Sequence, residues 1–209
     1  MKEKYHLVTS TLEETWDFNK KNLFAGEWCK LYSRKSQWQE LDHSTCDYHW
    51  NDREKYYEDS KYLRAVFKTC IESLTISLNT IHKENYSQRY WQILIGSWLH
   101  KFINILYDKF STIKILSSEY NIKSSYIIDL NYSFFVPKDT AEFNTFMLND
   151  LWNHLIFSEL QENFFNISYE KISFKGNYNE INRKFINYSK NESIKLKFIK
   201  LIDRLSKKL

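Results

Sequence analysis

Two long stretches of helical periodicity constrain the fold of this chain more than any other feature. The first begins near Asn51, which has Glu54 three residues on as in an N-terminal cap. Its apolar side chains recur at steps of three and four, at Leu63, Phe67, Cys70, Ile71, Leu74, Leu78 and Ile81. The second covers roughly 87–118 and is apolar nearly all round in its first half, so we expect other elements to cover it on most sides. Because the 209 residues include three Gly and one Pro, a sandwich or barrel of many hairpins is disfavoured.

Short β-rich segments precede these helices. The segment 5–11 ("YHLVTST") predicts a strand, and the hydroxyl and carboxylate residues after it predict a short helix through Trp16 and Phe18. The segment "NLFAGEWC" then predicts a second strand that ends at Gly26. A strand, a helix and a second strand in this order are typical of the opening of an α/β domain.

The rest of the body continues this pattern. Residues 33–50 lack periodicity and indicate a loop, whereas 126–137 predicts a further strand. A third helix is expected to start at Asp139 or Thr140 and to carry an apolar stripe as far as Leu155. The fold class predicted is therefore α/β, rich in helices, with a short central and mostly parallel sheet flanked by long helices.

Charge and composition change along the chain, which predicts two parts. Residues 1–166 form an α/β lobe, and residues 167–209 form a basic Lys/Asn-rich extension that ends in an amphipathic helix. From residue 171 onward, 11 Lys/Arg stand against 3 Asp/Glu, a net charge of +8, so residues 1–170 carry −4 of the total of +4. The terminal helix could pack on the body, bind a partner protein or contact an anionic membrane surface peripherally. The acidic balance of the body argues against nucleic acid as a partner.

Composition also excludes several classes of protein. Three Cys without CxxC spacing and an opening segment without an apolar core predict a reduced, cytoplasmic protein with no secretory signal. The familiar nucleotide and hydrolase motifs are absent, so no cofactor is predicted. The histidines His49, His82 and His100 lack ligand spacing to Cys or carboxylates, and no metal site is predicted.

The stretch "GEWCKLY" (26–32) is the first candidate site. Gly26, Glu27 and Trp28 lie just past a predicted strand, where α/β folds place their ligands. Glu27 is a candidate general base or a ligand for a substrate hydroxyl. In the alternative reading the stretch is a structural turn, in which Trp28 fills the core and Glu27 is a solvated charge.

The stretch "HWNDREKYY" (49–57) is the second candidate site. His49, Asn51, Asp52 and Arg53 stand at a predicted helix start, where unpaired N–H groups attract phosphate or carboxylate. Arg53 adds a bidentate donor, and His49 can take or give a proton near neutral pH. The alternative is a capped helix with Trp50 as its hydrophobic staple.

Arg89 and Trp91 open the second long helix in a similar way and complete the predicted site. We expect Gly26–Glu27, His49–Arg53 and Arg89–Trp91 to meet around one hollow, with Glu27, His49 and Asp52 as catalytic residues. Gly26, Trp28, Asn51, Arg53, Arg89 and Trp91 are the predicted substrate-binding residues. The polar side chains of Asp108, Asp150 and His154, on predicted helix faces, are assigned structural roles.

Five segments in order resemble a known family: "FAGEWCKLY", "YHWNDREKYYEDSKYL", "LNTIH", "YSQRYWQILIGSWLHKFINILYDKF" and "PKDTAEFNTFMLNDLWNHLI". From about residue 5 to 157 the chain is similar to the amino-terminal part of a family of transferases encoded in bacterial O-antigen and surface-polysaccharide loci. The resemblance implies the first lobe of a two-lobed glycosyltransferase, with nucleotide-sugar binding mainly in a second lobe. The chain departs from the family at Ser97, where a Pro is expected, and in ending after the first lobe, which suggests truncation.

Two functions follow as hypotheses. The first is the first lobe of a sugar transferase, truncated, which binds an acceptor sugar or an anionic group. Its partners would then be a nucleotide sugar or acceptor glycan and a protein that supplies the second lobe. The alternative is a non-catalytic remnant that binds a partner, or a subunit of a split enzyme.

Overall fold

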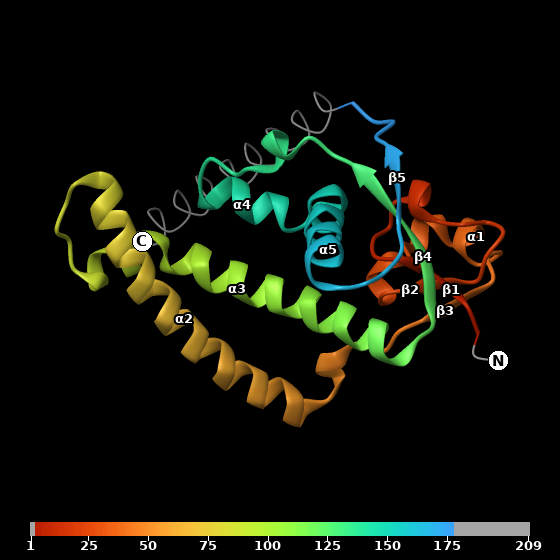
Figure 1. The fold of residues 1–209 in the computed structure, drawn as a ribbon, viewed down its shortest axis with the longest axis horizontal. Helices are drawn as coiled ribbons and strands as arrows, with labels where there is room; N and C mark the ends of the chain where they lie inside the picture. Colours follow the sequence, from red (N-terminus) through yellow and green to blue (C-terminus); the bar gives the residue numbers. More distant parts are fainter. Residues whose placement is uncertain (1–2, 178–209) are drawn as a thin grey trace, which may run out of the picture.

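The computed structural model describes residues 3–177, which form a five-stranded parallel sheet with helices around it (Figure 1). The strands are β1 (Tyr5–Val8), β2 (Asn22–Phe24), β3 (His43–Thr45), β4 (Ile122–Asp129) and β5 (Glu170–Ser173), in the order β3-β2-β1-β4-β5. The helices are α1 (Lys35–Trp38), α2 (Arg53–His82), α3 (Gln88–Glu119), α4 (Thr140–Phe146) and α5 (Asp150–Phe164). The predicted fold class is confirmed.

The central strands are short and buried. Leu7 of β1 stands opposite Leu23 of β2 in the parallel register, and both side chains are fully buried. Ile113 of α3 and Phe157 of α5 belong to the same hydrophobic cluster. In Figure 1, α5 and α1 lie on opposite sides of the strands. Short, continuously apolar strands of this kind are typical of a parallel sheet covered on both faces.

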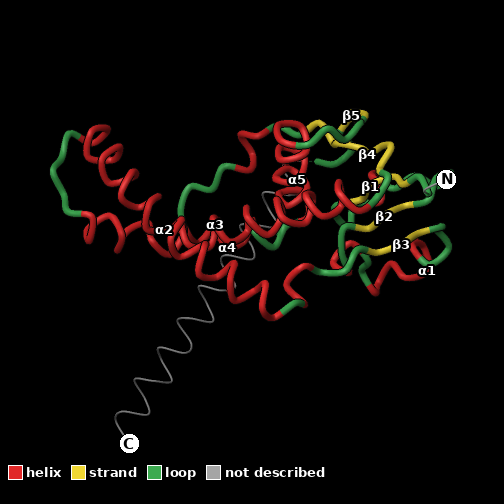
Figure 2. The backbone as a smooth tube through the Cα atoms, turned by 60° about the horizontal axis from the view of Figure 1, so that its bottom comes forward, coloured by secondary structure: helices red, strands yellow, loops and turns green. Residues whose placement is uncertain are grey.

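The helices α2 and α3 form a long hairpin that reaches away from the sheet (Figure 2). With 30 and 32 residues they are roughly 45 and 48 Å long. Asp52 caps α2 by accepting from the backbone N–H groups of Glu54 and Lys55, and Ser87 caps α3 by accepting from that of Tyr90. Both predicted helices are thus confirmed, although the cap of the first is Asp52 and not Asn51. No helix in the described part of the chain is long and apolar enough to cross a membrane.

Two predictions for the second half of the body are wrong. The strand expected over 126–137 ends at Asp129, because the side chain of Asn131 accepts from the backbone N–H of Ser133 and starts a 3-10 turn. The helix expected to continue to Leu155 is two helices. Asn149 accepts from the backbone N–H of Trp152 at 3.0 Å and so begins α5 anew.

Two edge strands escaped the sequence pattern. The segment 33–50, expected to be a loop, contains α1 and β3, and β5 pairs with β4 inside the segment 167–209. Both strands lie at the ends of the sheet and are half-buried or exposed, so neither has the apolar run that marks a central strand. The predicted terminal helix lies outside the described residues.

Candidate functional site

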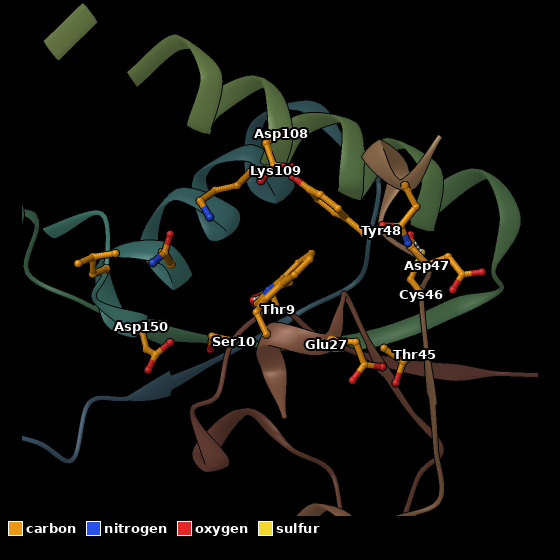
Figure 3. A pocket seen from close by; sticks show the side chains of 14 residues that line it. Thr9, Ser10, Glu27, Thr45, Cys46, Asp47, Tyr48, Asp108, Lys109 and Asp150 are labelled. Carbon is orange, nitrogen blue, oxygen red and sulfur yellow. Dashed lines mark hydrogen bonds between the residues drawn. The ribbon is translucent and has the colours of Figure 1, made fainter. Parts of the chain in front are cut away.

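A pocket of about 620 Å³ lies beyond the carboxyl ends of the central strands (Figure 3). We call it the edge pocket. The strand order reverses at β1, which has β2 on one side and β4 on the other, and open parallel sheets bind ligands outside the carboxyl ends of strands at such a point. Its lining comes from the loops after β1, β2 and β3 and from α3, α4–α5 and α5: Thr9, Ser10, Glu27, Trp28, Thr45, Cys46, Asp47, Tyr48, Asn51, Asp108, Lys109, Leu148, Asp150 and Asn153.

The floor of the edge pocket carries an exposed aromatic ring. The indole Nε1–H of Trp28 donates to the backbone carbonyl of Thr9 at 3.3 Å, which fixes the ring over the end of β1. The ring lies directly against Gly26, where an added Cβ would come within 2.1 Å of the indole. Trp28 is 39% exposed and meets Tyr48 edge-on at 5.9 Å. The pocket therefore offers a flat apolar surface between polar side chains.

Asp108 and Lys109 enter the edge pocket from the middle of α3, on the side opposite Thr9 and Ser10 (Figure 3). The Asp108 carboxylate lies 2.9 Å from Nε2 of His49, and the Tyr48 hydroxyl hydrogen bonds to it as well. Two donors thus fix the orientation of this carboxylate. Burial, and then the negative charge of Asp108, raise the pKa of Tyr48, so its hydroxyl stays protonated and remains a donor.

His49 stands behind Asp108 and holds it. Its ring is buried between Tyr48 and Trp50, with ring centroids at 5.0 and 4.8 Å. Its other ring nitrogen, Nδ1, is buried and has no hydrogen-bond partner among residues 3–177. With Nε2 on Asp108, His49 is a positioning residue for a carboxylate that lines the pocket.

Lys109 is 8% exposed although it lines the pocket. Burial lowers the pKa of its ammonium to about 8, and the nearby negative charges of Asp108 and Asp150 oppose that shift without cancelling it. The ammonium lies 4.5 Å from the ring centroid of Phe157.

Two buried groups near the pocket are structural. Burial raises the pKa of Cys29 to about 12, so its thiol is not a nucleophile at neutral pH. Burial lowers the pKa of His154 to about 4, and its Nε2 accepts from the backbone N–H of Ile128 at 3.0 Å. The neutral ring thus completes the backbone hydrogen bonding of β4, in line with the structural role expected of it.

The structure brings only part of the predicted site together. Glu27, Trp28 and Asn51 line the edge pocket, Gly26 lies under the indole, and His49 contacts a lining residue. The Glu27 carboxylate is at the rim, exposed, paired with Lys30 at 2.8 Å, and it points away from Asp108 and Lys109 (Figure 3).

The start of α2 beyond Asn51 lies outside the pocket lining. Asp52 is the exposed cap of the helix, and Arg53 is exposed. Asp52 therefore acts as the helix cap of the alternative reading, and neither Asp52 nor Arg53 is among the residues that line the edge pocket.

The expected convergence is wrong for Arg89 and Trp91. Trp91 is 6% exposed, donates to the Asn79 side chain at 2.9 Å and packs on Ile71, while Arg89 is exposed beside it. Both stand in the first turn of α3, at 1.5 Å per residue about 28 Å (Arg89) and about 26 Å (Trp91) along the helix axis from Asp108. Both residues therefore lie at the end of the α2–α3 hairpin that is farthest from the sheet.

The lining residues that the sequence did not single out, or assigned a structural role, include Asp108, Lys109, Asp150 and Tyr48. One signal was available: Asp108 and Lys109 place two adjacent charges in the otherwise apolar stretch of the second long helix. Within residues 3–177, no group of three or more His, Cys, Asp or Glu side chains is arranged to hold a metal ion.

An α/β fold with a polar and aromatic pocket at the carboxyl edge of a parallel sheet is typical of a ligand-binding protein. The model of the LIC12162 family transferase matches residues 5–209, so this chain belongs to that family of transferases. This match extends to residue 209, whereas the resemblance recognised in the sequence ends near residue 157. Comparison with curated proteins and with solved structures gave no match.

Proposed function

We propose that this chain is the first lobe of a cytoplasmic sugar transferase of surface-polysaccharide or O-antigen biosynthesis, and that the edge pocket binds the acceptor sugar. The observation that carries the proposal is the partly exposed indole of Trp28, which lines one pocket together with Asp108 and Asp150 in a transferase-family protein. A pyranose ring packs its C–H face on an aromatic ring, and its hydroxyls donate to carboxylates.

The charge of the edge pocket favours an acceptor over a nucleotide donor. Glu27, Asp47, Asp108 and Asp150 line it, and Lys109 is the one Lys or Arg among its described lining residues. A nucleoside diphosphate carries several negative charges and would meet repulsion there. Donor binding is accordingly assigned to a second lobe, as the sequence resemblance implies.

Asp108 is the proposed general base. Its carboxylate takes the proton of the acceptor hydroxyl as that oxygen forms a bond to the anomeric carbon of the donor sugar. The bond from this carbon to the leaving phosphate oxygen breaks, and the electron pair leaves with the nucleotide. His49 and Tyr48 hold the carboxylate in position. Glu27, predicted as the base, is proposed as a rim contact for the acceptor, and Asp52 as a helix cap.

The experiment is a transfer assay with labelled nucleotide sugars and a panel of acceptor glycans, run on the full chain alone and with a separately expressed second lobe from a longer relative. We expect sugar transfer, and a rate about 10²–10⁴-fold lower in Asp108→Asn. Saturation-transfer NMR with the same acceptors reports binding independently of turnover. If no acceptor glycan binds the full chain or is glycosylated, the proposal is wrong.

The alternative, a partner-binding remnant or a subunit of a split enzyme, stays a prediction. The basic segment motivates this alternative and also the predicted peripheral membrane contact. Most of this segment lies outside the described residues.

A further inference from the structure

Lys109 stands in the wall of the edge pocket with most of its side chain buried and with no protein acceptor for its ammonium among residues 3–177. The Lys109 side chain projects from α3 toward the side of the hollow where Ser10 and Asp150 lie (Figure 3). Within residues 3–177 its ammonium makes no hydrogen bond and no ion pair shorter than 4.0 Å, and its closest recorded partner is the ring of Phe157.

Two other lysines near the long helices have partners although they are more exposed. Lys55 pairs with Asp59 at 2.6 Å, and Lys101 of the same helix α3 donates to the Asn144 side chain at 2.7 Å. Lys109 is more buried than either. An ammonium has three donors and is strongly hydrated in water, so partial burial without a protein acceptor disfavours its charged form. The lowered pKa of Lys109 reports that effect.

The position of Lys109 links this effect to a ligand. The residue is adjacent in sequence to Asp108, and its ammonium and the Asp108 carboxylate face the same hollow. A ligand that fills the hollow would bring acceptors to the three donors while its hydroxyls donate to Asp108 and Asp150. The single ammonium can bind one oxyanion group, whereas a ligand with several such groups, such as a nucleoside diphosphate, would meet repulsion from the carboxylates of the lining.

We infer that Lys109 is the anion-binding residue of the edge pocket, and that the pocket takes a sugar bearing a single oxyanion group, a carboxylate or a phosphate, in addition to its hydroxyls. This inference rests on the proposed function, because it names the class of sugar that the pocket accepts. The oxyanion accepts charge-assisted hydrogen bonds from the ammonium, Asp108 and Asp150 accept from hydroxyls, and the ring lies on Trp28.

The test is isothermal titration calorimetry on the full chain with three probes: a neutral hexose, a hexuronate and a hexose 1-phosphate. The variants are Lys109→Met, which keeps the length of the side chain and removes its charge, and Lys114→Met. Lys114 is an exposed lysine of the same helix, outside the pocket lining, and serves as the matched control. Circular dichroism checks that each variant is folded.

We expect at least one charged probe to bind the wild type about tenfold or more tightly than the neutral hexose, as for a hydrogen bond to a charged group. Lys109→Met should abolish that preference, and Lys114→Met should leave it intact. Whether the hexuronate or the hexose 1-phosphate binds more tightly identifies the source of the oxyanion.

Equal binding of the neutral and charged probes to the wild type would overturn the inference and leave the proposed function standing. So would a charge preference that survives in Lys109→Met. If none of the three probes binds, and the acceptor panel also fails to bind, the inference and the proposed function are both wrong. Should Lys109→Met fail to fold, the comparison of the three probes on the wild type still decides.

Discussion

The starts of α2 and α3 look alike in the sequence and differ in the structure. Each combines an Arg, a Trp and a helix cap, at His49–Arg53 and at Ser87–Trp91. The first lies beside the edge pocket, with Asn51 in its lining and His49 on Asp108. The second lies at the far end of the hairpin, where Trp91 is buried against α2.

The difference is caused by what precedes each helix. The start of α2 follows β3, and the carboxyl ends of parallel strands lie at one edge of the sheet. The start of α3 follows α2, a helix of roughly 45 Å that has carried the chain away from that edge. The chain returns to the edge only in the middle of α3, where Asp108 and Lys109 stand. A polar and aromatic cluster is therefore a stronger site candidate when it directly follows the carboxyl end of a strand.

The largest effect is expected from Asp108→Asn. The substitution keeps the shape and the acceptor for His49 but removes the base, so the transfer rate should fall about 10²–10⁴-fold with the fold intact. Initial rates of sugar transfer measure it. Glu27→Gln is the matched control at the rim and should cost less than about tenfold, because this carboxylate is exposed and turned away. A larger loss for Glu27→Gln than for Asp108→Asn would return the base to Glu27.

Trp91→Ala should be the most destabilising change at the start of α3. It removes a buried ring and its hydrogen bond to Asn79, and substitutions of this kind cost about 3–5 kcal/mol of the free energy of unfolding. Urea denaturation measures the loss, with Tyr90→Ala as the half-exposed neighbour that should cost much less. Saccharide affinity of the folded Trp91→Ala protein should be unchanged. Loss of that affinity would place a ligand at the hairpin end.

Lys109 should make stability depend on pH. Its pKa is about 8 in the folded chain against an ordinary 10.5. Below pH 8 both states are protonated, and the cost of the buried charge is present in full. Between pH 8 and 10.5 the unfolded chain keeps a proton that the folded chain has released, so the free energy of unfolding rises by about 3 kcal/mol.

The rise is measured by urea denaturation of the wild type against Lys109→Met at pH 7 and pH 10. Lys114→Met is the control and should follow the wild type, since Lys114 is exposed on the same helix. Equal pH dependence in the wild type and in Lys109→Met would show that the ammonium is not buried unpaired in the pocket wall.

The smallest effect is expected at the two helix caps, where the two helix starts should behave alike. Asp52→Ala and Ser87→Ala each remove an acceptor for backbone N–H groups and should each cost about 1 kcal/mol of the free energy of unfolding. Thermal denaturation measures both. Neither substitution should change saccharide binding. A specific loss of binding in Asp52→Ala would restore the predicted catalytic or ligand role of Asp52.

The parts of the fold that the sequence predicted are those with a strong period. The apolar steps of α2 and α3 and the buried strands β1 and β2 are continuous patterns, and they appear where they were expected. The elements that the sequence did not predict are bounded by a single hydrogen bond or lie at an edge of the sheet. Asn149 divides α4 from α5 with one side-chain cap, and β3 and β5 are half-buried or exposed strands with no apolar run.

The candidate site was predictable only where it lies next to a strand end. Glu27 and Trp28 follow β2, and His49 and Asn51 follow β3, so strand position alone brought them near the edge pocket. Asp108 reaches it from the middle of a long helix, and nothing in the spacing of the sequence says where along α3 the sheet edge falls. That register depends on how the whole hairpin packs on the sheet, which is a tertiary property.

Indole N–H spectra of the ¹⁵N-labelled full chain, titrated with hexose 1-phosphate and with neutral hexose, compare the two regions most directly. Trp28→Phe and Trp91→Phe assign the two indole signals that matter. If saccharide binds at the sheet edge, the Trp28 signal shifts in proportion to occupancy and the Trp91 signal stays in place. A shift of Trp91 without one of Trp28 would contradict that location and put the ligand at the end of the hairpin.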